Sequence, residues 1–87
     1  MKLPVTVTID YEPTYPATYI YYVPEERVNN PLSRRIGDTV VVDVDRVTGE
    51  LAGIELLDLE PATIITARKI ASDHGAEFPA HLTAVPA

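Results

Sequence analysis

Apolar and polar residues alternate along the first two thirds of the chain, which is the pattern of β-strands with one buried face. Residues 5–11 alternate valine, isoleucine and tyrosine with threonine and aspartate. Pro13 and Pro16 cannot donate a backbone hydrogen bond within a sheet, so the chain is expected to turn there. Residues 17–23 then predict a second strand, and residues 32–36 predict a third.

The segment from Thr39 to Leu57 predicts a β-hairpin. Its first strand has a row of three valines, with two aspartates among the residues of the other row, so the valines are expected to face the core and the carboxylates to face water. Its second strand alternates an apolar row with a row that contains Glu55. The expected core row is Val40, Val42, Val44, Ala52, Ile54 and Leu56, and the expected outer row is Val41, Asp43, Asp45, Leu51, Gly53 and Glu55.

Asp45 and Gly49 are the residues that favour a turn between these two strands. An aspartate carboxylate can accept a hydrogen bond from the backbone two residues further on, and glycine adopts a positive φ without a Cβ clash. We therefore predict φ > 0 at Gly49.

A change of period after the hairpin predicts an α-helix over about residues 60–74. Asp58 is a candidate N-cap, Pro61 suits the first turn, and Gly75 suits the position that ends a helix. The expected inner face is Thr63, Ile64, Ala67, Ile70, Ala71 and His74. Ile65 falls outside this face, and residues 76–87 are expected to form an extended tail that lies on this domain or on a neighbour.

These elements predict one α+β domain over residues 1–87, in which an antiparallel β-meander of four to five strands packs on one face against the C-terminal helix. A chain of 87 residues has a thin core, so a deep enclosed active site is hard to build. Cysteine is absent, which removes disulfides, thiolate catalysis and zinc sites with cysteine ligands. No cofactor is expected from the motifs present.

A net charge of −6 and scattered basic residues exclude the concentrated positive patch that nucleic acid requires. The acidic surface instead favours encounter with a basic protein partner. No apolar run reaches the roughly 20 residues of a membrane-spanning helix, and the first residues lack a signal-peptide core. We therefore expect a cytoplasmic protein with neither a nucleic-acid nor a membrane partner.

Three carboxylates, Asp43, Asp45 and Glu55, are the candidate metal ligands, because oxygen ligands on one face suit a hard cation such as Mg²⁺ or Ca²⁺. The alternative is that they form the solvated face of a half-buried sheet. His74 and His81 are seven residues apart, too far for a ligand pair on one helical face. His74 is expected to interact with the negative end of the helix dipole instead.

Five tyrosines lie between residues 11 and 22. They are interpreted as aromatic pairs within the sheet, as a protein interface, or as a platform for nucleic-acid bases, which the negative charge opposes. Surplus apolar residues on so small a domain predict self-association as a homodimer. The interface candidates are Tyr19, Tyr21, Tyr22 and Ile65.

Several short motifs, taken in order over about residues 8–59, resemble the bacterial domain of unknown function 2283. They are Tyr11-Glu12-Pro13, Ala17-Thr18-Tyr19-Ile20, Val41-Val42-Asp43-Val44-Asp45, Gly49 and Gly53-Ile54-Glu55-Leu56-Leu57-Asp58. The chain departs from the pattern at Glu12, where the family tends to have aspartate, at Pro16, where an acidic residue is usual, and by one extra residue in the turn at 46–48. The resemblance implies no established activity and only an antitoxin-like role.

The leading hypothesis is therefore a small non-catalytic module that binds a protein partner or itself. The competing hypothesis is a small metal-dependent enzyme that uses Asp43, Asp45 and Glu55. The two differ in whether these three side chains converge in a cleft or stand apart.

Overall fold

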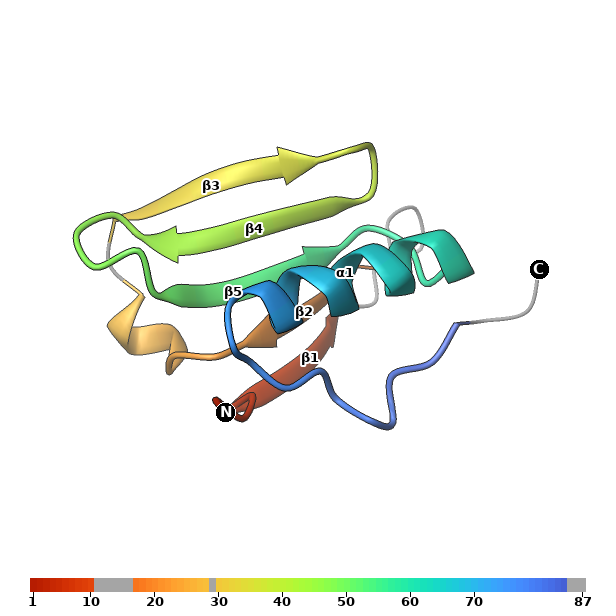
Figure 1. The fold of residues 1–87 in the computed structure, drawn as a ribbon, viewed down its shortest axis with the longest axis horizontal. Coiled ribbons are helices and arrows are strands. Elements are labelled where there is room, and N and C mark those ends of the chain that lie inside the picture. The colour runs from red at the N-terminus through yellow and green to blue at the C-terminus, as the bar shows by residue number, and fades with distance from the viewer. Residues whose placement is uncertain (11–16, 29, 85–87) are drawn as a thin grey trace.

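The alternating runs form the strands of one antiparallel sheet in the computed structural model, which describes residues 1–10, 17–28 and 30–84 (Figure 1). The elements are β1 (Thr6–Asp10), β2 (Ala17–Tyr21), the 3-10 helix η1 (Glu25–Arg27), β3 (Pro31–Ile36), β4 (Val40–Asp45), β5 (Leu51–Leu56) and α1 (Pro61–Asp73). Five strands on one C-terminal helix confirm the predicted α+β fold class.

The strand order is β1-β2-β5-β4-β3, so a two-stranded hairpin joins a three-stranded meander. β5 is the central strand and pairs with β2 on one side and β4 on the other. The segment with η1 carries the chain from β2 to the far edge of the sheet (Figure 1). As a consequence β1 and β3 are the two edge strands, and each pairs with one strand of the described residues.

The hairpin of β4 and β5 has the predicted core row, with one correction. Val40, Ile54 and Leu56 are buried, as expected. The register shifts between Asp43 and Val44, so that Val44 pairs with Leu51 while Asp43 pairs with Gly53. This β-bulge turns Leu51 into the core, where the regular alternation had placed it on the outer row.

Helix α1 covers β4 and β5 with most of the face that the sequence predicted. Thr63, Ile64, Ala67 and Ala71 are buried and Ile70 is half-buried, whereas His74, predicted on the same face, is exposed at the helix end. Asp58 is not its N-cap. The N-cap is Glu60, and the Asp58 carboxylate instead accepts hydrogen bonds from the Glu60 N–H and the Thr63 hydroxyl. Asp58 therefore fixes the entry to the helix without capping it.

The helix ends as predicted at a left-handed glycine, Gly75, with φ of +67°. The Gly75 N–H donates to the Ser72 carbonyl and the Ala76 N–H donates to the Ala71 carbonyl, which is the Schellman arrangement. The chain then leaves the helix as an extended tail.

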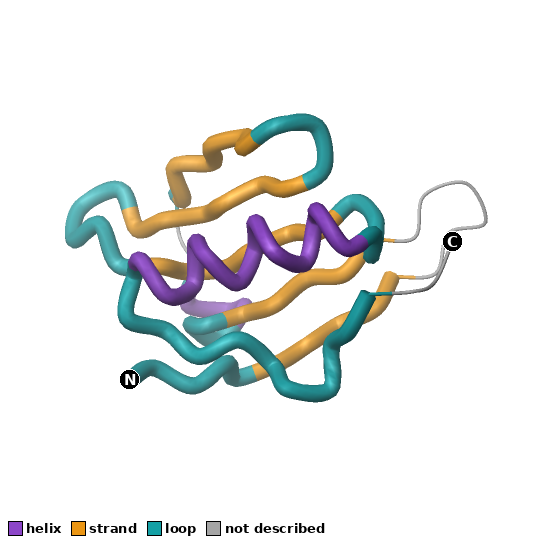
Figure 2. Tube along the Cα trace, turned by 45° about the vertical axis from the view of Figure 1, so that its right-hand side comes forward, coloured by secondary structure: helices purple, strands orange, loops and turns teal. Residues whose placement is uncertain are grey.

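The tail lies on the same face of the sheet as α1, beside β1 and β2 (Figure 2). Ala76 and Leu82 are buried, and the Phe78 ring packs against the same core. The Lys2 N–H donates to the Gly75 carbonyl and the Glu77 N–H donates to the Lys2 carbonyl. The described part of the tail therefore packs on its own domain, and neither it nor α1 covers the face that carries Tyr19 and Tyr21.

Candidate functional site

The three candidate metal ligands each have a partner of their own. The Asp43 carboxylate accepts a 2.6 Å hydrogen bond from the Ser33 hydroxyl of β3. The Asp45 carboxylate accepts from the backbone N–H groups of Val47 and Thr48 at 2.8 and 2.9 Å. Within residues 1–10, 17–28 and 30–84 no three Asp, Glu or His side chains are grouped so that they could hold a metal ion. The three carboxylates therefore stand apart rather than converge.

Electrostatics support separate structural roles for these carboxylates. The two backbone N–H donors in the turn hold the pKa of Asp45 below its ordinary value. On the same face of the sheet, Glu55 pairs in register with Tyr19, and a hydrogen bond to Glu55 raises the pKa of the Tyr19 hydroxyl above its ordinary value. The carboxylates thus stabilise a turn and a cross-strand pair.

Tyr19 and Tyr21 form a stacked pair on the face of the sheet opposite α1, with ring centroids 6.0 Å apart and planes inclined by 14°. Tyr21 pairs in register with Gly53, where an added Cβ would lie 3.0 Å from the Ile20 carbonyl oxygen of the same neighbouring strand. Tyr22 points the other way and is only 3% exposed, so it leaves the set of interface candidates. Tyr11 and Tyr15 lie outside the described residues.

The remaining candidates are separate from one another. Ile65 is 67% exposed on the side of α1 that faces away from the sheet. His74 is the C-cap of α1, at the negative end of the helix dipole, as the sequence predicted. His81 lies in the tail and lines a different cavity from His74. The two histidines therefore do not form one site.

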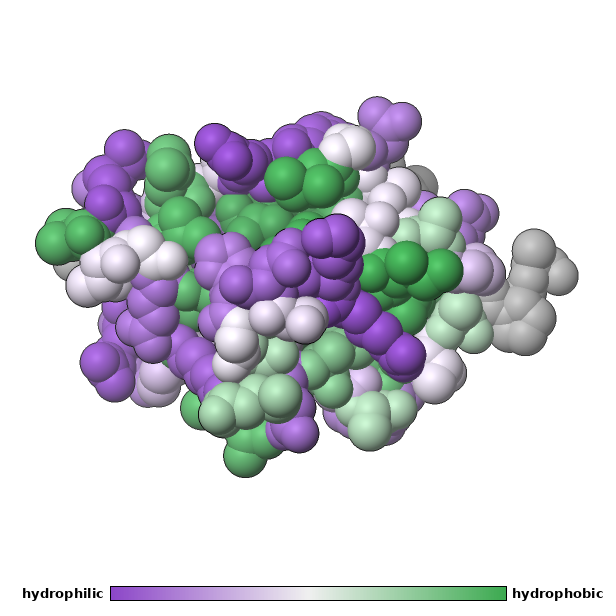
Figure 3. Space-filling view, viewed as in Figure 1, coloured by the Kyte–Doolittle hydropathy of each residue, from purple (hydrophilic) through white to green (hydrophobic). Residues whose placement is uncertain are grey.

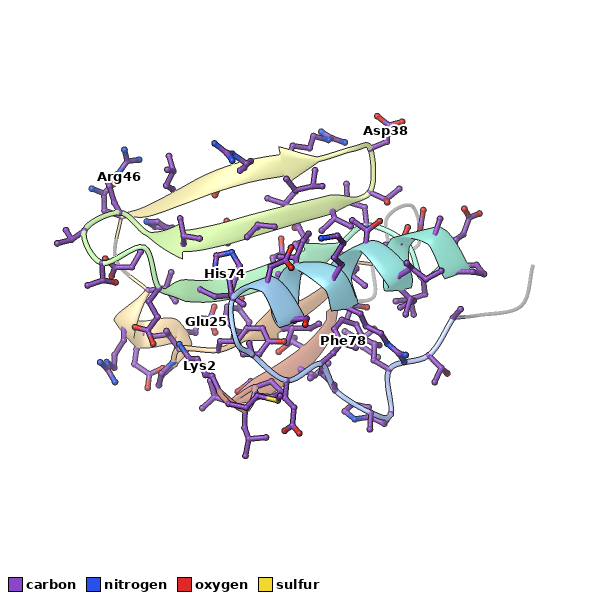
Figure 4. All side chains as sticks on the ribbon, in the orientation of Figure 1. Lys2, Glu25, Asp38, Arg46, His74 and Phe78 are labelled. Carbon is purple, nitrogen blue, oxygen red and sulfur yellow. The ribbon has the colours of Figure 1, made fainter. Side chains whose placement is uncertain are left out.

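An apolar groove runs between α1 and the edge strand β3, and sequence reasoning missed it. Its volume is about 360 Å³. Figure 3 shows hydrophobic residues gathered between the helix and the polar rim of the sheet. The apolar lining is Leu32, Ile36, Val42, Val44 and Ile70. Arg34, Asp73 and His74 provide its polar groups, and His74 marks the C-terminal end of the helix in Figure 4.

A second cavity of about 530 Å³ lies beside the other edge strand, between the N-terminal segment and the tail. Leu3, Val5 and Val7 line it from one side, and Phe78 and Pro79 line it from the tail. The Arg68 guanidinium lies 5.5 Å above the centre of the Phe78 ring and so holds the tail against the helix. A cavity or groove with apolar residues in its lining therefore lies beside each edge strand of the sheet.

Comparison of the chain with family models, with curated proteins and with solved structures finds no match. Among the described residues, no helix combines the length and apolar character needed to cross a membrane.

Proposed function

We propose that this protein is a non-catalytic interaction module that forms a homodimer by pairing the β1 strands of two copies. The observation that carries the proposal is the chemistry of this edge. Residues Thr6 to Ile9 contain no charge, and Val5 and Ile9 are 55% and 49% exposed. An edge strand without charged side chains presents unpaired backbone groups that readily pair with another strand.

β1 is also complementary to itself. In an antiparallel pair about a two-fold axis at Val7, Val7 lies opposite Val7 of the second copy. The same register sets Val5 opposite Ile9 on the helix side and Thr6 opposite Thr8 on the side away from the helix. Apolar residues therefore meet apolar residues, threonine meets threonine, and no like charges meet along Val5 to Ile9.

The area of a stable interface indicates that residues beyond β1 belong to the proposed dimer interface. A standard interface buries about 800 Å² on each partner, which is about one seventh of the 5789 Å² of this chain. Five strand residues alone expose too little area for that. The cavity beside β1 extends the apolar surface through Leu3, Phe78 and Pro79, so these residues are expected to lie in the same interface.

Sedimentation equilibrium at tens of micromolar tests the proposal. The wild-type chain is expected at twice its mass of 9.6 kDa. Ile9→Lys places a charge on the β1 edge and should give a monomer, whereas Leu32→Lys is the matched control because Leu32 is a similarly exposed apolar residue of the other edge strand. A monomeric wild type contradicts the proposal. A dimer that survives Ile9→Lys but not Leu32→Lys would assign the interface to β3.

An antitoxin-like role is one form of this proposal and rests on the resemblance to the domain family alone. A basic protein partner is supported by the net charge of −6. No observation favours the metal-dependent enzyme, since its three carboxylates are engaged separately.

A further inference from the structure

The second edge strand, β3, differs from β1 in charge and in its surroundings. Leu32, Arg34 and Ile36 alternate along its helix-facing side, and all three line the groove under α1. Leu32 is 44% exposed. Arg34 makes no ion pair with any residue in the described part of the chain. The edge therefore offers two apolar contacts that flank a cation with no ion-pair partner among the described residues.

We propose that the β3 edge and the adjoining groove bind an extended acidic peptide segment of a partner protein, which adds to the sheet as a sixth strand. Side chains of an added strand alternate between the two faces of the sheet. Those on the helix side would lie opposite Leu32, Arg34 and Ile36. The matching peptide has an apolar residue, an acidic residue and an apolar residue at alternate positions, with backbone hydrogen bonds that supply affinity independent of sequence.

Arg35 extends this preference to the side of the same strand that faces away from α1. It lies beside Ser33 there, donates to the Asp38 carbonyl at 3.0 Å and makes no ion pair with a described residue. An acidic residue next to the central acid of the peptide would face it. The protein as a whole carries −6, but charges further than about 8 Å are largely screened at physiological ionic strength. The Asp73 carboxylate also lines the groove, but it is paired with Lys69. The two arginines are the charges of this edge that make no ion pair with a described residue, and they therefore decide which peptide is preferred.

The same arginines argue against a second copy of this chain at β3. An antiparallel register that sets Leu32 opposite Ile36 also sets Arg34 opposite Arg34 of the second copy. Like charges directly opposite each other destabilise a strand pair. β1 has no such conflict in its best register, so the two edges suit different occupants.

A random nine-residue peptide library, selected on the immobilised full chain at physiological ionic strength, tests the inference. Enriched sequences are expected to have an acidic residue with apolar residues two positions before and after it. In calorimetry with a synthetic enriched peptide, Arg34→Glu should weaken binding about tenfold, because it removes one attraction and adds a repulsion. Arg27→Glu makes the same charge change on the exposed helix η1 and should leave affinity within about twofold.

A charge-swapped peptide gives a second test of the role of Arg34. This peptide has lysine in place of the central acid. Its affinity for the Arg34→Glu variant should be higher than its affinity for the wild-type protein. Amide shifts in ¹⁵N spectra should move along β3 and the last turns of α1. The inference is overturned if the enriched peptides lack acidic residues, or if Arg34→Glu leaves the affinity for the enriched peptide unchanged. It is also overturned if the amide shifts occur on the face of the sheet that carries Tyr19. Repeating the binding with Ile9→Lys separates it from the proposed dimer, because peptide binding should survive in a monomer.

Discussion

The hydroxyl of Tyr22 donates a 2.6 Å hydrogen bond to the backbone carbonyl of Glu77, which is 55 residues further along the chain. It joins the end of β2 to the tail and lies where the ring is buried. Tyr22→Phe keeps the ring and removes only the hydrogen bond, so it should lower the free energy of unfolding by about 0.5–1.5 kcal/mol at neutral pH. Urea unfolding at pH 7 measures this difference.

The same residue predicts sensitivity to alkali. Burial raises the pKa of Tyr22 to about 12, from an ordinary value of 10.0. Because the folded-state pKa is the higher one, the stabilisation is present below pH 10 and is lost as the pH rises towards 12. Tyr22→Phe should reduce the loss of stability between pH 9 and pH 12, and the double variant with Tyr19→Phe should reduce it further, since the pKa of Tyr19 is also raised. Equal alkaline slopes for the wild type and both variants would contradict this.

Any side chain at Gly53 in the central strand is predicted to destabilise the protein. A Cβ at this position would lie 3.0 Å from the Ile20 carbonyl oxygen and 4.0 Å from the Tyr21 ring. The carbonyl belongs to the neighbouring strand of the ladder and cannot move without a shift of the backbone. Gly53→Ala should destabilise the protein by about 1–3 kcal/mol, the usual cost of overpacking. Chemical denaturation measures it, with Ala52→Gly as a variant that removes rather than adds atoms.

The helix and strands could be predicted because each is determined mainly by residues close together in the sequence. The edge strands and the groove could not, because they depend on the order of the strands in the sheet. A period of two between residues 40 and 56 suffices to predict the β4–β5 hairpin. No local sequence pattern predicts that β2 pairs with β5 rather than with β3. This long-range pairing makes β3 an edge strand. Leu51 was placed wrongly because a bulge shifts the phase of one strand. The groove was missed because it exists only where α1 stops short of β3.

Asp45 is predicted to make the β4–β5 turn sensitive to acid. Its lowered pKa means that the ionised carboxylate is favoured in the folded state, so its contribution is present above the ordinary pKa of 3.8 and is lost as the pH falls below it. Asp45→Asn keeps an oxygen that can accept from Val47 and Thr48 but cannot titrate. Thermal melts between pH 2 and pH 7 should therefore fall less steeply for Asp45→Asn than for the wild type, whereas Asp45→Ala should melt lower at every pH.

The separation of the acidic residues predicts that this hairpin face binds no divalent ion specifically. Asp43 and Asp45 are held by a hydroxyl and by backbone donors, and no three acidic or histidine side chains of the described segments are grouped for an ion. Calorimetric titration with Mg²⁺, Mn²⁺ and Ca²⁺ should show no saturable site at micromolar concentrations. A stoichiometric site that disappears in Asp43→Asn would favour the metal-dependent enzyme instead.

Gly49 has the positive φ, +74°, that its place in the turn predicted. A Cβ there would meet nothing within 4 Å, so any cost of substitution comes from the backbone conformation and not from a clash with neighbours. Gly49→Val should destabilise the protein by about 1–3 kcal/mol, because a β-branched residue is strained in this region. Asparagine tolerates the same conformation, so Gly49→Asn is the control and should recover most of the loss. If both variants unfold at the urea concentration of the wild type, the turn does not depend on this φ, and the hairpin must be held by the paired strands alone.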